Sequence, residues 1–151
     1  FLRLPDGELV PDLAFRERIV RQIRTYRPDI VITHDPFRPY ALHPDHRAVG
    51  ITTIDAVYPT ARDPLYFPQH LAEGLEPHKV AELWLFGAQY PDLYVDIEET
   101  MDLKLAALTA HRSQISDPVE LAQRVRERAA EVGAARGLRY AEAFKVIVLR
   151  R

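Results

Sequence analysis

From Ile30 to His46 the chain reads Ile-Val-Ile-Thr-His-Asp-Pro-Phe-Arg-Pro-Tyr-Ala-Leu-His-Pro-Asp-His. The run 30–32 predicts a buried strand, because continuous β-branched residues are typical of a parallel strand covered on both faces. Pro44 suits the first position of a helix, which the apolar run 49–57 then continues. The stretch is therefore a strand, a loop and a helix. In open α/β sheets, ligands bind at the carboxyl ends of such strands.

Two histidines and an aspartate stand at the start of this predicted helix. His43 and His46 are three residues apart, so both rings can face one site if the first turn is helical. A neutral imidazole is a common metal ligand, and a second imidazole nearby can transfer a proton. Asp45 could fix the tautomer of a histidine ring through its other nitrogen. The alternative is a polar helix cap, but the preceding strand and Pro44 favour the chemical interpretation.

The composition is that of an ordinary globular domain, with 151 residues, 47% hydrophobic and 28% charged. The net charge of −2 argues against a nucleic-acid partner, which would require a basic surface. Because the chain has no cysteine, any transition metal must be held by nitrogen and oxygen ligands. No apolar run approaches the roughly 20 residues that span a bilayer, so we expect no membrane partner and a cytoplasmic protein.

Hydrophobic periodicity and end signals predict the remaining elements. Helices are expected at 13–26 with Asp12 as N-cap, at 98–112, and from Pro118 to about Gly133. Strands are expected at 80–86, 94–97 and 145–149. The proline-rich segment 59–78 is interpreted as a surface excursion at the mouth of the site or as a contact in a homo-oligomer.

Several polar residues outside the histidine pair are expected to be structural. A solvated helix face explains most of the arginines between Arg16 and Arg24. His70 and His78 are taken as polar surface residues. His34, one residue past the apolar strand, is taken as a hydrogen-bonded structural histidine.

The order and spacing of several motifs resemble the PIG-L/LmbE-like de-N-acetylases. These are zinc enzymes that hydrolyse N-acetyl groups, commonly on N-acetylglucosamine-containing substrates. The resemblance runs nearly the whole length of the chain, through Leu4–Leu9, Arg27–Pro36, His43–Gly50, Val95–Ile97 and Lys104–Gln114. It implies an α/β fold with a Rossmann-like open, mostly parallel sheet flanked by helices.

One motif of that family is missing from this chain. The family carries an Ala-His-Pro-Asp-Asp-type motif, which supplies a His and an Asp to zinc and a second Asp as general base. Here the only His-Pro-Asp is at residues 43–45. We therefore expect residues 1–151 to be the C-terminal part of a single LmbE-like deacetylase domain that lacks its first strand or strands. The other metal ligands would lie upstream of Phe1, and this part alone would be inactive.

The resemblance also implies roles for single residues. His46 would be a ligand to one zinc or other divalent ion per site. His43, as an imidazolium, would stabilise the oxyanion and protonate the leaving amine, and Asp45 would hold a histidine in its working tautomer. Candidate substrate-binding residues are Asp6, Arg38, Tyr40 and His111.

Three of these four candidates have an alternative role or depart from the family pattern. Asp6 is also a turn former in Pro-Asp-Gly, and His111 also suits a helix C-terminus. For Tyr40, some family members place the tyrosine one residue nearer the His-Pro-Asp-His, and here that place is Leu42.

The expected reaction is hydrolysis of an N-acetyl or N-acyl group on an N-acetylated sugar. Three other functions stay open. The same family includes amidases that act on thiol conjugates. A metal-dependent phosphoesterase could use the same His-Pro-Asp-His, although no Gly-rich loop or Lys stands nearby to bind phosphate. A non-catalytic sugar- or partner-binding module would lack the upstream ligands altogether.

Overall fold

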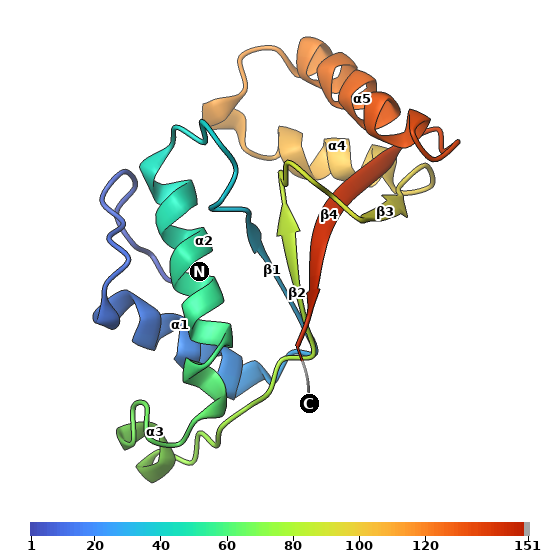
Figure 1. The fold of residues 1–151 in the computed structure, drawn as a ribbon. Helices are drawn as coiled ribbons and strands as arrows, with labels where there is room; N and C mark the ends of the chain where they lie inside the picture. The colour runs from blue at the N-terminus through green and yellow to red at the C-terminus, as the bar shows by residue number, and fades with distance from the viewer. Residues whose placement is uncertain (150–151) are drawn as a thin grey trace. The chain divides into compact units, whose positions relative to one another are not determined.

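The computed structural model describes residues 1–149, which contain five α-helices, two 3-10 helices and four strands (Figure 1). The α-helices are α1 (Leu13–Tyr26), α2 (Pro44–Val57), α3 (Gln69–Ala72), α4 (Met101–Thr109) and α5 (Pro118–Ala134). The 3-10 helices are η1 (Thr60–Arg62) and η2 (Arg112–Gln114). The strands are β1 (Ile30–His34), β2 (Glu82–Phe86), β3 (Leu93–Asp96) and β4 (Ala141–Val148).

The strands form one mixed sheet in the order β1-β2-β4-β3. β1 and β2 are parallel, with Ile30 opposite Glu82 and His34 opposite Phe86. β2 and β4 are antiparallel. The predicted α/β class is confirmed. The sheet is mixed instead of mostly parallel as expected, because β4 pairs antiparallel with β2. The site was expected at the carboxyl ends of parallel strands, and β1 and β2 form the parallel pair.

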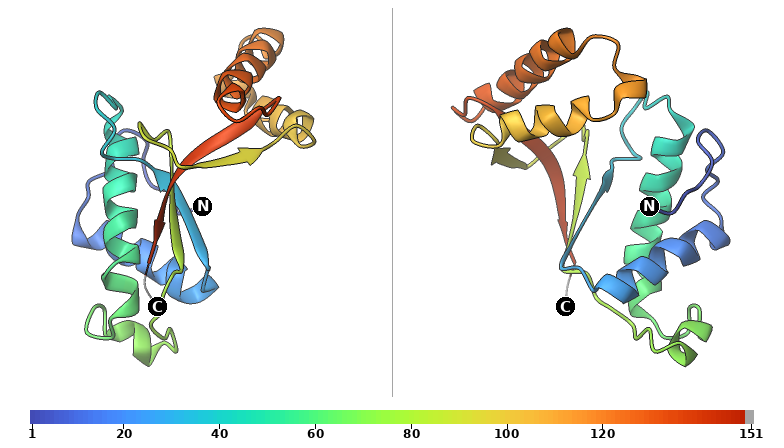
Figure 2. Two further views of the ribbon diagram at one scale, coloured as in Figure 1. Left: turned by 45° about the vertical axis from the view of Figure 1, so that its right-hand side comes forward. Right: turned by 180° about the vertical axis from the view of Figure 1, so that it is seen from behind.

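The chain divides into two compact units, residues 1–91 with the chain from Phe144 onward, and residues 92–143. The first unit contains the predicted strand, loop and helix. In it α1 and α2 lie on the same face of β1 and β2 (Figure 2). Their contact buries a core of Val20, Ile23, Ala56, Val57, Ala61, Val80, Leu83 and Leu85.

Local end signals set the bounds of α1 and α2. The Asp12 side chain accepts a hydrogen bond from the Phe15 amide at 2.8 Å, as an N-cap does. α1 ends at Arg27, whose φ of 49° is left-handed, directly before Pro28. α2 begins with Pro44 in its first turn. Both predicted ranges, 13–26 and 44–57, are confirmed.

The prediction that strand 30–32 is covered on both faces is wrong. Ile30 is 42% exposed and Ile32 is 53% exposed. Successive side chains of a strand point to opposite faces, and α1 and α2 cover the face of Val31 and Thr33. In the sheet formed by residues 1–149, β1 is also an edge strand. The second apolar face of β1, which carries Ile30 and Ile32, is therefore left exposed by the described residues.

The interpretation of Arg24 and His70 as surface groups is also wrong, because they are 2% and 0% exposed. The Arg24 guanidinium donates hydrogen bonds to His70 Nδ1 and to carbonyls in the segment that follows α2. These are the carbonyls of Thr60, Ala61, Asp63, Tyr66 and Phe67, at 2.9–3.4 Å. His70 Nε2 lies 3.2 Å from Glu17 Oε1. The buried guanidinium of Arg24 therefore stabilises the proline-rich segment by bonding its backbone carbonyls.

His78, like His70, was predicted to be a surface residue but is at least partly buried. His78 is partly buried, and its Nε2 lies 2.8 Å from the Pro28 carbonyl oxygen. Burial lowers the pKa of His70, and the hydrogen bond that its Nε2 donates to the Glu17 carboxylate opposes that shift. Both rings therefore serve the fold of this segment.

The second unit has its own core of Ile97, Met101, Leu105 and Ala129. α4 is shorter than the predicted helix 98–112 at both ends, since it spans Met101–Thr109 and the separate 3-10 helix η2 begins at Arg112. β4 begins at Ala141, four residues before the predicted start at Lys145. Within residues 1–149, no helix combines the length and the apolar character needed to cross a membrane.

Candidate active site

Three histidine rings stack at the carboxyl end of β1. The His46 ring lies between the other two, 4.1 Å from the centroid of His34 and 4.4 Å from that of His43. The rings are nearly parallel, with interplanar angles of 13° and 18°. The Phe86 ring contacts His34 at 4.2 Å. The predicted pair is thus part of a larger cluster that includes His34 and Phe86.

A close approach between helix and strand brings this cluster together. At Gly50 of α2, a Cβ atom would lie 2.8 Å from the backbone oxygen of His34 and 3.0 Å from Pro36 Cβ. Only a glycine allows the helix to come so near the end of β1. His46 is one helical turn earlier than Gly50, so its ring meets His34. A glycine in mid-helix was the sequence signal for this approach.

His43 is the N-cap residue of α2, so a histidine provides the polar helix cap that was considered as the alternative. Its Nδ1 accepts a hydrogen bond from the Asp45 amide at 3.2 Å. An accepting Nδ1 carries no proton, so the neutral His43 ring holds its proton on Nε2. His43 is exposed, which leaves the Nε2–H open to a ligand.

His34 was expected to be a structural histidine, and the structure places its ring against the candidate ligand His46. Burial, and next the charges that His46 and His43 can carry, lower the pKa of His34. A neutral His34 stacks on His46 without electrostatic repulsion. Its position at the end of a parallel strand was the sequence signal that pointed to the site.

The carboxylate of Asp45 binds a segment far away in the sequence. Its Oδ2 accepts from the Gly7 amide at 2.6 Å, and its Oδ1 accepts from the Leu9 amide at 3.2 Å. Asp45 is 7% exposed. Among residues 1–149, neither carboxylate oxygen hydrogen-bonds a histidine ring. The predicted role of Asp45 toward a histidine therefore stays a prediction.

The loop 36–42 is fixed at both ends. The Asp35 side chain accepts from the Phe37 amide at 2.9 Å, and Arg47 Nη1 donates to the carbonyls of Ala41 and Leu42. Of the two substrate-binding candidates here, Arg38 has its Nη1 3.7 Å from where a Cβ of Gly87 would lie, just past β2. Tyr40 is 94% exposed with φ of 60°. The substrate-binding roles of Arg38 and Tyr40 stay predictions.

The remaining candidates lie in different units. Asp6 is an exposed residue of the turn that Asp45 holds through Gly7, so it belongs to the unit of the histidine cluster. His111 is exposed and precedes η2 in the second unit. Its role stays a prediction.

The described residues fit part of a metal site. His46 is exposed, and within residues 1–149 neither of its ring nitrogens makes a hydrogen bond, so a lone pair can bind a cation. Residues 1–149 contain no set of three His, Asp or Glu side chains arranged to hold a metal ion. His46 could therefore serve as one ligand, but the described residues do not complete a metal site.

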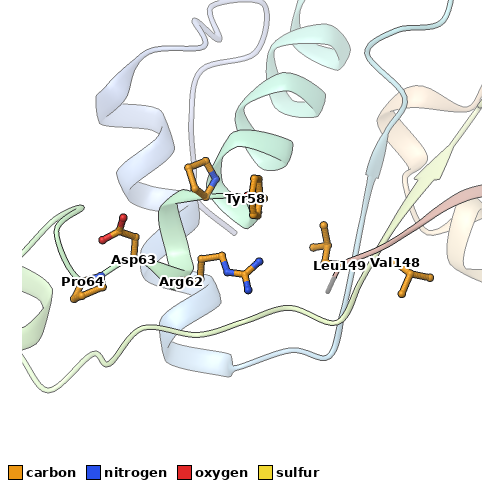
Figure 3. A pocket seen from close by; sticks show the side chains of 7 residues that line it. Tyr58, Arg62, Asp63, Pro64, Val148 and Leu149 are labelled. Atoms are coloured by element: carbon orange, nitrogen blue, oxygen red, sulfur yellow. The ribbon is translucent and has the colours of Figure 1, made fainter. Parts of the chain in front are cut away.

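A surface hollow of about 710 Å³ lies elsewhere in the first unit (Figure 3). Its lining includes Tyr58, Arg62 and Asp63 at the C-terminal end of α2, with Val148 and Leu149 of the last strand and its extension. The histidines stand at the other end of this 14-residue helix, about 21 Å away along its axis. The hollow is thus separate from the histidine cluster.

Known proteins resemble this chain in sequence and in fold. Residues 1–57 match the family model for PIG-L, described as GlcNAc-PI de-N-acetylase. A diacetylchitobiose deacetylase from Thermococcus kodakarensis is 38% identical over 144 residues, which cover 94% of this chain and 54% of that protein.

Two solved structures resemble the chain. An N,N'-diacetylchitobiose deacetylase from Pyrococcus horikoshii, complexed with its inhibitor MPG, has a TM-score of 0.88 and 32% identity. The match covers 96% of this chain and 55% of that one. The conserved protein TT1542 from Thermus thermophilus has a TM-score of 0.71 and 25% identity, with 98% of this chain and 65% of that one covered.

The chain spans just over half the length of the two diacetylchitobiose deacetylases. The matches nevertheless run along nearly all of the chain, histidine cluster included. They confirm the resemblance seen in the sequence: the chain is a relative of the PIG-L/LmbE-like de-N-acetylases.

Proposed function

We propose that this chain supplies one part of the catalytic centre of a metal-dependent de-N-acetylase. The reaction is hydrolysis of an N-acetyl group on an N-acetylglucosamine-type substrate. The observation that carries the proposal is the pairing of His43 and His46 at the start of α2, against the carboxyl end of β1. Similarity to two diacetylchitobiose deacetylases supports the substrate class.

His46 would hold a zinc ion together with ligands from outside residues 1–149. Three protein ligands with one open position are typical of catalytic zinc sites, and within the cluster of His34, His43 and His46 only His46 is exposed with no hydrogen bond at its ring nitrogens. When bound, zinc lowers the pKa of water and polarises an amide carbonyl. The free edge of β1 and the exposed Ile30 and Ile32 are consistent with further polypeptide beside this strand.

His43 would act on the reacting amide through Nε2. In the capped geometry its neutral ring donates from Nε2–H, which suits an oxyanion that forms on the former carbonyl oxygen. Protonation of the leaving amine requires the imidazolium form. In that form Nδ1 also carries a proton and must release the Asp45 amide. Oxyanion stabilisation thus uses the geometry seen here, and proton transfer requires a change at the cap.

The phosphoesterase alternative receives no support from the cluster. Arg38 and Arg47 are the cations of the loop and first turn, and Arg47 is engaged with two backbone carbonyls. A thiol-conjugate amidase uses the same amide chemistry and differs only in the rest of its substrate. The substrate that is hydrolysed therefore separates the alternatives. A de-N-acetylase releases acetate from the sugar, a phosphoesterase releases phosphate, and a thiol-conjugate amidase hydrolyses the amide of a thiol conjugate.

The test uses the polypeptide extended upstream of Phe1, with residues 1–151 alone as the control. Each protein is supplied with zinc and with N,N'-diacetylchitobiose, a thiol-conjugated N-acyl glucosamine or a phosphomonoester. We expect the extended protein to release acetate from diacetylchitobiose and residues 1–151 to release none. Phosphate release, or turnover of the thiol conjugate alone, would replace the proposal with that activity. Sugar binding without turnover would assign a binding module.

A further inference from the structure

The proline-rich segment 59–78, which contains η1 and α3, is bonded to α1 through the buried side chain of Arg24. The Arg24 guanidinium donates to five backbone carbonyls of this segment and to His70 Nδ1, which lies 3.3 Å from Arg24 Nη1. Carbonyl oxygens and an imidazole nitrogen are neutral acceptors. The segment is thus built around a buried cation, and the side chain that it contributes to that cation is a histidine.

The contact with Arg24 fixes the protonation state of His70. A guanidinium can only donate hydrogen bonds, so His70 Nδ1 accepts and carries no proton. The ring proton then lies on Nε2, which is 3.2 Å from Glu17 Oε1 and donates to it. The neutral ring therefore satisfies both of its partners.

A second proton on His70 does not fit this arrangement. It would set an N–H of the ring against an N–H of Arg24, and it would place two cations 3.3 Å apart where both side chains are buried. The charged groups that face His70 are Glu17, Arg21 and Arg24 of α1, and Glu73 at the C-terminal end of α3. Arg21 already binds both carboxylates, since it lies 3.7 Å from Glu17 and hydrogen-bonds Glu73. These carboxylates are therefore shared with a cation before His70 is charged.

We infer that Arg24 and His70 form an acid-sensitive lock, which holds segment 59–78 on α1 while His70 is neutral and releases it when His70 is protonated. A proton at Nδ1 displaces the guanidinium of Arg24, and the carbonyls that it binds lose their donor. The segment also carries Pro59, Asp63 and Pro64 of the hollow in Figure 3, so its release changes that hollow. The lock is independent of the proposed function, because it involves no residue of the histidine cluster.

The direction of the pH dependence follows from the surroundings of His70. Burial lowers the pKa of His70, the hydrogen bond to Glu17 opposes this shift, and the charges of Arg21 and Arg24 add to it. The released ring, with an ordinary pKa of about 6.5, therefore binds a proton more readily than the locked ring. The lock keeps its full strength above about pH 6.5 and weakens as the pH falls below that value.

His78 in the same segment provides a matched comparison. Its Nε2 lies 2.8 Å from the carbonyl oxygen of Pro28, which can accept a hydrogen bond from the neutral or the protonated ring. Acid therefore breaks the contact of His70 and keeps that of His78. Glutamine does not titrate, and its amide can accept from Arg24 and donate to Glu17, so His70→Gln keeps the bonds of the lock without its proton.

Hydrogen–deuterium exchange of α3 in the protein extended upstream of Phe1 tests the lock. Protection, corrected for the intrinsic effect of pH on exchange, should fall at least about tenfold from about pH 7.5 to about pH 5, since linkage allows up to about tenfold per pH unit. His78→Gln should lose as much protection as the wild type, whereas His70→Gln should lose less than about twofold. The amides that report this change bond carbonyls within the segment, and they are those of His70, Leu71, Glu73, Gly74 and Leu75.

An equal loss of protection in the wild type and in His70→Gln, or no loss in the wild type, would overturn the lock. So would disappearance of the acid effect in His78→Gln. The wild type offers a second readout in case His70→Gln fails to fold. Its His70 nitrogen chemical shifts should show an unprotonated Nδ1 at about pH 7.5, and Nδ1 should gain its proton at the pH where α3 loses protection. A proton on Nδ1 at about pH 7.5, or a titration that leaves α3 protected, would contradict the inference.

Discussion

Replacing His46 with alanine in the protein extended upstream of Phe1 is expected to abolish binding of the catalytic metal. Within the histidine cluster, His46 is the exposed imidazole whose ring nitrogens make no hydrogen bond, and a three-ligand site that loses a ligand rarely keeps its affinity. The loss of metal affinity should exceed the roughly 10–100-fold that follows removal of a residue that only hydrogen-bonds a metal ligand. Metal content after dialysis, measured by elemental analysis, is the readout.

His78→Ala is the control for the loss of an imidazole from the same unit. His78 bonds the Pro28 carbonyl and lies outside the histidine cluster, so this variant should keep one metal equivalent. Retention of a full equivalent by His46→Ala would refute the assignment of His46 as a ligand. Because His46 is exposed, its replacement should leave the folded structure intact, and circular dichroism checks this.

Replacing His43 with alanine is expected to keep the metal but lower turnover by about 10²–10⁴-fold, the usual contribution of a general acid or base. Loss of the imidazole ring leaves both the oxyanion and the leaving amine without a hydrogen-bond or proton donor. Loss of the metal in this variant would mean that the roles of His43 and His46 are exchanged.

His43→Gln separates the two functions of this histidine. The glutamine amide can donate a hydrogen bond but cannot transfer a proton. Since the capped geometry places the proton on Nε2, we expect Gln to restore at least tenfold of the activity that Ala loses. Equal activity of the Gln and Ala variants would assign the contribution of His43 to proton transfer alone.

Helices that begin or end at a capping residue or a proline could be predicted directly from the sequence. Asp12, Pro28 and Pro44 act on the residues next to them, so the bounds of α1 and α2 could be predicted without knowing the sheet. The same local logic placed His43 and His46 in one turn. β4 lacks such signals. Its start at Ala141 depends on pairing with neighbouring strands, which the sequence of β4 alone does not specify.

Partners far apart in the sequence account for the errors. Arg24 sits among arginines that suit a solvated helix face, but its acceptors are carbonyls 36–43 residues further along. The carboxylate of Asp45 binds amides 36 and 38 residues earlier. Periodicity within an element cannot reveal such contacts. The places of His34 and Phe86 in the cluster likewise required the register of β1 and β2.

The exposure of Ile30 and Ile32 shows the limit of composition as a guide to burial. Their side chains suit a covered strand, while in residues 1–149 they point away from α1 and α2. An apolar sequence pattern indicates that a strand is suited to a buried environment. It does not show which polypeptide provides that environment.

The central claim is that His46 holds one part of a metal site for amide hydrolysis. Its most direct test is acetate release from N,N'-diacetylchitobiose by the extended protein after complete removal of metal with a chelator. The account predicts no release by the metal-free protein, and full recovery when one equivalent of zinc is added. Residues 1–151 alone should bind zinc weakly or not at all. Undiminished acetate release by the metal-free protein would contradict the account.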